Sequence, residues 1–164
     1  MKKLSVSVLL LLLINFGCKS EEDNIIEKVK NLVVQTRYED ALEILNVAIK
    51  KYPDSSKLYV ERGSILYTLI FRVENNFLSK SLASKALDDF QNSIRIKPTF
   101  DGYIGLGNVY GFLHDPVLSE RSYKKAQEYS TTDEMKSIVQ SNLGMVYLSK
   151  KNYDDALVCF YKSQ

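Results

Sequence analysis

The stretch NLGMVYLSKKNYDDALVCFYKS, residues 142–163, carries a pattern that recurs along the chain. It places small residues, Gly144 and Ala156, and aromatic residues, Tyr147 and Phe160, at set positions on two apolar runs. The same arrangement occurs earlier in GLGNVYGFLHDPVLSERSYKKA, residues 105–126, whose Leu-Gly pair lies 37 residues before the later one. Self-similarity at such a period indicates stacked structural repeats.

Two weaker copies precede these. RYEDALEILNVAIKKYPDS, residues 37–55, supplies the second half of a copy, and residues 25–35 keep only an apolar stripe before it. LYVERGSILYTL (58–69) and SKALDDFQNSIRIKPTF (84–100) form another copy, with about eleven extra residues near 70–81. These extra residues either lengthen both helices or form a loop that contacts a partner.

The pattern resembles the tetratricopeptide repeat (TPR), a 34-residue helix–turn–helix with an L-G-x₂-Y…A-x₃-F…P signature. The resemblance implies an all-α, right-handed α-solenoid of about four repeats, at about 22–55, 56–99, 100–133 and 137–164. Pro53 and Pro98 follow helices that they would end, and Asp115-Pro116 is typical of a turn. The alternative is an all-helical bundle whose periodicity arises by chance.

Close packing explains why the pattern needs these residue types. Glycine and alanine let two helices approach, and the aromatic residues fill the gap that remains. The residues expected to pack the repeats together are Ala41, Leu45, Ala48, Gly63, Ala86, Phe90, Leu106, Gly107, Tyr110, Tyr123, Ala126, Leu143, Gly144, Tyr147, Ala156 and Phe160.

The N-terminal segment has the pattern of an export signal. Lys2 and Lys3 precede an eleven-residue apolar stretch, Leu4–Ile14. It is shorter than the roughly 20 residues that span a bilayer, but it fits the apolar region of a signal peptide. A buried core helix is the alternative.

Gly17-Cys18 resembles the lipobox of bacterial lipoproteins, although Asn15 and Phe16 depart from its usual residues. The resemblance implies removal of residues 1–17, a lipid on Cys18, a lipidated acidic tether at 18–24 and a solenoid at 25–164. It also implies a lipid-anchored place in the bacterial cell envelope, at the outer membrane, facing the periplasm or the surface. The alternative to lipidation is that Cys18 is incidental and an ordinary signal peptidase cuts nearby. Lys19 and the acids after it resemble a surface-export signal, and a solvated, acidic tether is the alternative.

The composition argues against catalysis and nucleic-acid binding. The chain has 22 basic and 20 acidic side chains, and Lys2 and Lys3 lie in the export segment, so the domain lacks the basic excess typical of nucleic-acid binders. Its one histidine, His114, lies in a predicted turn, and no phosphate-binding or zinc motif is present. We therefore expect no enzyme, metal or cofactor. With Cys18 lipidated, Cys159 would be the only free thiol.

The first helix of each repeat is expected to line a concave groove for a protein or peptide partner. The candidate groove residues form a second apolar stripe: Val60, Ser64, Tyr67, Ile104, Asn108, Phe112, Met145 and Leu148. Such a stripe either marks a binding site or packs on a neighbouring repeat. The stripe lacks the lysines and arginine with which TPR relatives clamp an acidic C-terminus.

The last helix has no polar cap after it, so Leu157, Val158 and Tyr161 are expected to be partly bare. They either dock a second copy or a partner, or belong to a frayed helix. The interpretation is a membrane-anchored scaffold or assembly factor. The alternatives are a structural subunit docked through its ends and a secreted, non-lipidated periplasmic adaptor.

Overall fold

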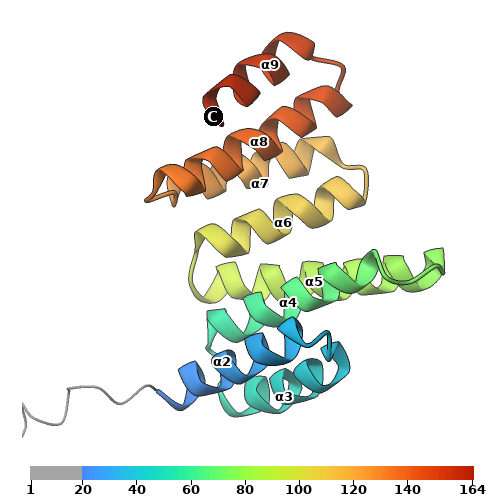
Figure 1. Ribbon diagram of the computed structural model, residues 1–164, viewed down its shortest axis with the longest axis vertical. Helices are drawn as coiled ribbons and strands as arrows, with labels where there is room; N and C mark the ends of the chain where they lie inside the picture. Colours follow the sequence, from blue (N-terminus) through green and yellow to red (C-terminus); the bar gives the residue numbers. More distant parts are fainter. Residues whose placement is uncertain (1–19) are drawn as a thin grey trace, which may run out of the picture.

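The computed structural model describes residues 20–164, so the expectations for the signal peptide and for Cys18 lie outside the described residues. Within that range the chain folds into eight α-helices and no strand (Figure 1). They are α2 (Glu21–Val34), α3 (Tyr38–Lys51), α4 (Ser56–Ile70), α5 (Asn76–Ile96), α6 (Phe100–Phe112), α7 (Pro116–Glu128), α8 (Asp133–Ser149) and α9 (Tyr153–Lys162).

The helices form four hairpins, α2–α3, α4–α5, α6–α7 and α8–α9, stacked one on the next along the long axis (Figure 1). The first helix of the second hairpin, α4, also touches the first helices on either side of it, α2 and α6. The all-α solenoid predicted from the repeats is confirmed.

Local sequence sets the helix boundaries. Seven of the eight helices begin at a side chain that accepts a hydrogen bond from the first turn, and only α3 begins without one. Three hairpins share one tight turn, in which Thr36, His114 or Lys151 adopts a positive φ of 58–59°. In each, the next residue donates its N–H to a carbonyl five positions back. This is the hydrogen bonding of a Schellman-type helix end, and it gives His114 a structural role.

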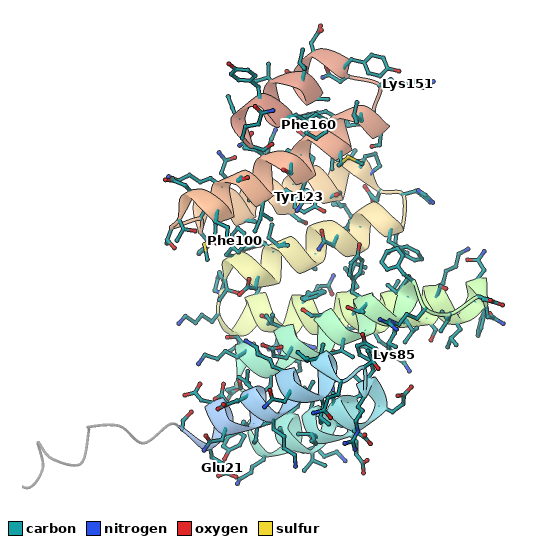
Figure 2. All side chains as sticks on the ribbon, viewed as in Figure 1. Glu21, Lys85, Phe100, Tyr123, Lys151 and Phe160 are labelled. Atoms are coloured by element: carbon teal, nitrogen blue, oxygen red, sulfur yellow. The ribbon has the colours of Figure 1, made fainter. Side chains whose placement is uncertain are left out.

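Glycine–aromatic pairs hold three of the four hairpins together. A Cβ added to Gly107 would lie 2.4 Å from the Tyr123 ring, and one added to Gly144 would lie 2.6 Å from the Phe160 ring. Tyr123 is buried and Phe160 half-buried, each against the first helix of its own hairpin (Figure 2). The second hairpin repeats the contact with Gly63 and Phe90.

The first hairpin has no such glycine. At the matching places it has Val29 and Leu45, which are both fully buried. The first helix thus has valine in place of glycine, and the second has leucine in place of the larger aromatic ring. This exchange explains how the first hairpin keeps the fold without the Leu-Gly pair.

Most of the expected packing residues are buried, but Tyr110, Tyr147 and Phe160 are only half-buried. The cores also contain buried residues outside the expected set, among them Leu58, Phe100, Val109, Val139 and Cys159. These residues contact the neighbouring hairpin or the adjacent helix rather than completing the repeat signature, so the signature alone did not mark them.

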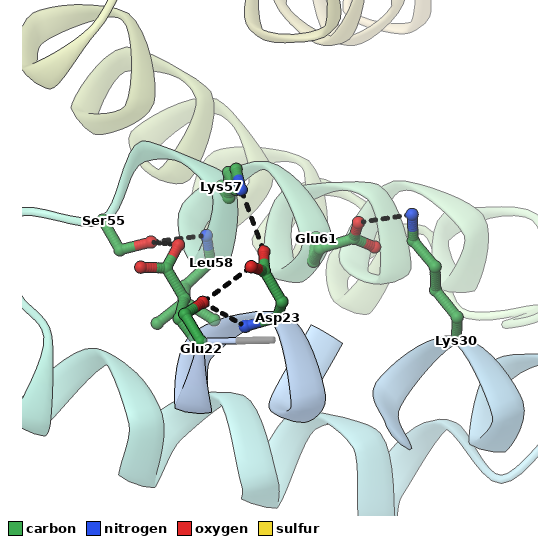
Figure 3. Close-up of polar contacts among 8 residues, drawn as sticks. Glu22, Asp23, Lys30, Ser55, Lys57, Leu58 and Glu61 are labelled. Carbon is green, nitrogen blue, oxygen red and sulfur yellow. Dashed lines mark hydrogen bonds and ion pairs between the residues drawn. The ribbon is translucent and has the colours of Figure 1, made fainter. Parts of the chain in front are cut away.

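The tether expected at residues 18–24 is wrong from Glu21 onward, because the acidic residues belong to the folded domain. Ser20 caps α2 by accepting from the N–H of Asp23 at 3.0 Å. Acidic side chains in a first turn are favoured by the helix dipole. Glu22 accepts from the Ser55 hydroxyl at 2.6 Å, and Asp23 pairs with Lys57 at 3.0 Å (Figure 3). The solenoid therefore begins at Glu21 rather than at residue 25.

The extra residues near 70–81 extend one helix rather than both. α5 has 21 residues, against 14 in α3 and 13 in α7, whereas α4 has 15. The connection between α4 and α5 is only residues 71–75, and the hairpin projects beyond its neighbours (Figure 1). Phe71 and Phe77 are exposed at this projecting end.

One largely buried ion pair lies within the second hairpin and is hydrogen-bonded to the first. Arg62 on α4 donates two hydrogen bonds to Asp89 on α5, at 2.9 and 2.7 Å, and a third to Asn46 on α3 at 2.8 Å. Asp89 is only 3% exposed. The pair therefore holds α4 and α5 together and sets their position against α3.

Candidate functional site: the cleft between α4 and α6

A cleft of about 400 Å³ lies between the first helices of the second and third hairpins. We call it the α4–α6 cleft. The two helices supply nearly all of its lining, with one residue each from α2 and α5: Lys30, Val60, Glu61, Ser64, Tyr67, Thr68, Phe90, Asp101, Ile104, Gly105 and Asn108. A smaller hollow continues it toward α2 and shares Lys30, Val60, Glu61 and Asp101.

One end of the α4–α6 cleft leads to three aromatic rings. Phe71 stands edge-on to Tyr67, with ring centroids 5.2 Å apart, and edge-on to Phe112, at 5.9 Å. We call these three residues the aromatic ladder. Phe71 is 65% exposed, whereas Tyr67 and Phe112 are half-buried. The ladder thus offers an apolar surface to anything bound in the cleft.

The other end is charged. Lys30 pairs with Glu61 at 3.4 Å (Figure 3). Burial raises the pKa of Glu61, and the nearby charge of Lys30 lowers it. The negative charge of Asp101 raises the pKa further, by a smaller amount. Asp101 is exposed and forms no ion pair within residues 20–164.

The middle of the cleft is polar above an apolar floor. Tyr123 donates its hydroxyl hydrogen to the side-chain oxygen of Asn108 at 2.7 Å. Burial raises the pKa of Tyr123, so its hydroxyl stays protonated and can donate. The amide nitrogen of Asn108 is then left with two N–H groups for a ligand. The ring of Phe90 forms the floor, beside Gly105 and Gly63.

The structure brings together five of the eight predicted groove residues. Val60, Ser64, Tyr67, Ile104 and Asn108 line the α4–α6 cleft. Phe112 reaches the same site through the aromatic ladder.

The predicted groove residues of α8 do not line the α4–α6 cleft. Met145 lines a separate hollow of about 330 Å³ with His114 and Asn142. Leu148 is 40% exposed and lines neither hollow. This hollow lies one hairpin further along the stack, between α6–α7 and α8, so a residue in the same register lines the next hollow.

Sequence reasoning missed Lys30, Glu61 and Phe71 as parts of this site. Lys30 and Glu61 belong to different repeats and meet only because α2 lies beside α4. Phe71 belongs to the irregular segment after α4, where periodicity gives no signal. Its aromatic character, next to Tyr67 in helical spacing, was the one available clue.

A second polar cluster joins α7 to α8 away from this cleft. Glu120 accepts from Lys124, Lys150 and Tyr147. The hydrogen bonds from Lys124 and Lys150 lower the pKa of Glu120 to about 2. This cluster stabilises the stacking of the third and fourth hairpins.

The described part of the chain contains neither a candidate metal site nor a candidate membrane-spanning helix. Residues 20–164 hold no group of three or more His, Cys, Asp or Glu side chains placed to bind a metal. No helix in the same range is long and apolar enough to cross a bilayer.

At the C-terminal end, α9 presents an exposed apolar face. Leu157 is 70% exposed, Val158 50% and Tyr161 79%, as the sequence predicted, and Tyr153 on the same helix is 65% exposed. Beneath this face, Cys159 is buried, and burial raises the pKa of its thiol.

Solved structures confirm the TPR-type fold. A thermophilic TPR protein of Thermus thermophilus, TTC0263, is 21% identical, with a TM-score of 0.77 over 88% of this chain and 73% of its own. A structure described as MamA MSR-1 C2 is 18% identical, with a TM-score of 0.62 over 80% of this chain and 68% of its own.

YrrB, described as a TPR protein with an unusual peptide-binding site, is 18% identical, with a TM-score of 0.52 over 85% of this chain and 82% of its own. No family model matches the chain, and no curated protein matches it in sequence. At these identities, the likeness establishes the fold alone.

Proposed function

We propose that this protein is an interaction scaffold or assembly factor of the bacterial cell envelope, binding a peptide or helix of a partner in the α4–α6 cleft. The observation that carries this proposal is the cleft itself. It combines an exposed aromatic surface with hydrogen-bonding groups that have no partner within the described residues. Partly exposed apolar surface with a few placed polar groups is the usual character of a binding site.

The proposal includes a lipid on Cys18 that holds the protein at a membrane, which we take to be the outer membrane. Support comes from the positive start, the apolar stretch Leu4–Ile14 and the Gly17-Cys18 pair. Only Lys19 and Ser20 separate Cys18 from the first residue of α2. Three residue steps span at most about 10 Å, so a lipidated chain would hold the first hairpin directly at the bilayer. Such confinement raises the effective concentration of partners at the same membrane.

A Cys18→Ser variant tests the anchor. Cells are grown with a clickable fatty acid, and labelling of the wild-type chain is compared with labelling of the variant. Labelling of the wild type alone, with recovery in the membrane fraction, supports the anchor. An unlabelled wild type recovered in the soluble fraction would instead favour a secreted adaptor without lipid.

The binding site is tested by two matched double variants. Tyr67→Ala/Phe112→Ala removes two rings of the cleft, and Tyr153→Ala/Tyr161→Ala removes two exposed rings of α9. Wild type and both variants are purified in mild detergent from the native cells, and the proteins that accompany them are identified by mass spectrometry. Circular dichroism establishes that both variants remain folded.

Loss of a partner in the first variant and retention in the second supports binding in the cleft. The reverse result would favour the second candidate function, a structural subunit docked through its end. The exposed apolar face of α9 is the observation in favour of that alternative. Its simplest form, docking of a second copy, requires that the chain be a dimer or larger in analytical ultracentrifugation. A monomer at high protein concentration would rule out that form.

A further inference from the structure

We infer that the α4–α6 cleft binds an extended peptide that carries a lysine or arginine at one end and an aromatic or aliphatic residue about five positions away. This inference rests on the proposed function and specifies the chemistry of its partner. It follows from how charge, apolar surface and hydrogen-bonding groups are ordered along the cleft.

The charged end favours a cation. Where the cleft meets the hollow toward α2, the ionisable lining residues are Asp23, Lys30, Lys57, Glu61 and Asp101. Both lysines already have carboxylate partners, since Lys30 pairs with Glu61 and Lys57 with Asp23. Asp101 is the one carboxylate of this group without a lysine partner, and its charge raises the pKa of nearby Glu61. A ligand cation placed here meets an unpaired carboxylate, whereas a ligand anion would have to displace an existing pair.

The far end favours an apolar side chain. The aromatic ladder is continuous with the cleft through Tyr67, and Phe71 presents most of its surface to solvent. Covering such rings with an aromatic or aliphatic side chain removes apolar area from water. No lysine or arginine lines the α4–α6 cleft at this end.

The length of α6 gives the spacing. Asp101 and Phe112 lie eleven residues apart on that helix, which at 1.5 Å per residue corresponds to about 16 Å. An extended peptide rises about 3.3 Å per residue, so about five residues cover this distance.

The middle of the cleft favours an extended ligand over a helical one. Asn108 keeps its amide N–H groups for a ligand because its oxygen is bonded to Tyr123. Ser64 on the opposite helix is exposed and can donate or accept. An extended peptide presents free backbone carbonyl and N–H groups to these side chains, whereas a helix has already paired them.

The test is selection from a displayed library of random nine-residue peptides on the full chain in mild detergent. Affinities of the selected peptides are then measured by fluorescence polarisation. The variants are Asp101→Asn, the matched control Asp154→Asn on α9, and Tyr67→Ala/Phe112→Ala. Asp101 and Asp154 are both exposed, so neither change should disturb folding.

We expect enrichment of a basic residue and an apolar residue about five positions apart. Asp101→Asn should weaken binding about two- to fivefold and reduce its salt dependence, as expected for one exposed charge pair. Asp154→Asn should leave the affinity unchanged.

The inference is overturned by selected peptides that lack a basic residue, or that bind Asp101→Asn as tightly as wild type. If such peptides still fail to bind Tyr67→Ala/Phe112→Ala, cleft binding stands and only the ligand chemistry is wrong. If no selected peptide depends on Tyr67 and Phe112, binding in the cleft fails as well.

Discussion

Gly105→Ala should destabilise the protein, although alanine is the better helix former. A Cβ at residue 105 would lie 2.2 Å from a ring carbon of Phe90, against about 3.5–4.0 Å for an unstrained contact. The ring has little room to move, because Phe90 is 2% exposed and also packs closely on Gly63, where an added Cβ would lie 3.1 Å from it. The ring therefore has to leave its position or force α4 and α6 apart.

The magnitude follows from two opposing effects. Overpacking a buried site costs about 1–3 kcal/mol, and an overlap this large belongs at the upper end. Replacing glycine by alanine inside a helix stabilises the helix by about 1 kcal/mol. We therefore expect a net loss of about 2 kcal/mol in the free energy of unfolding.

Gly111→Ala is the matched control, because it lies on the same helix. The nearest atom to a Cβ at Gly111 is the Ser119 hydroxyl oxygen at 3.6 Å, an ordinary contact. This variant should gain up to about 1 kcal/mol. The two alanine variants of α6 should thus differ by about 3 kcal/mol, or about 9 °C in Tm for a chain of this size.

Thermal and urea unfolding followed by far-UV circular dichroism measures both changes. The double variant Gly105→Ala/Phe90→Leu should lose less than the sum of the two single variants, since the smaller side chain relieves the overlap. A Gly105→Ala protein as stable as Gly111→Ala would refute the close packing of Phe90 between α4 and α6.

Three further predictions follow from other contacts. The pKa of Glu120 is about 2 in the folded protein, against about 4.5 in the unfolded chain. Ionised Glu120 therefore stabilises the fold fully above pH 4.5, and this contribution is lost as the pH falls toward 2. Between pH 4.5 and 2 the wild type should therefore lose about 1–2 kcal/mol in the free energy of unfolding, after allowing for solvent screening, whereas Glu120→Gln should not. Urea midpoints measured across this pH range test the difference. Asp89→Asn should cost about 2–3 kcal/mol in urea unfolding at neutral pH, because it leaves the Arg62 charge without its partner; an unchanged midpoint would contradict that role. A thiol reagent should label Cys159 slowly in the folded protein and rapidly in denaturant. If Cys18 is lipidated, intact mass spectrometry of the denatured chain should show one added label together with the lipid mass.

The sequence by itself determined the all-α repeat fold and the glycine–aromatic packing within the third and fourth hairpins. Gly107 with Tyr123, and Gly144 with Phe160, could be predicted because each partner recurs at a fixed spacing within its own repeat. Helix caps and turns are likewise local, since a capping side chain needs only the next three residues. The repeat pattern was thus sufficient for the fold.

Contacts between hairpins were decided only by the tertiary structure. Gly105 is small because Phe90, from the hairpin before it, occupies its Cβ position. The acids at the N-terminus suggested a tether, yet Asp23 pairs with Lys57, 34 residues away. Met145 keeps the register of a groove residue but faces another hollow. Periodicity assigns a residue to a face of its own helix, but the stacking of the hairpins determines which residues of other helices share that face.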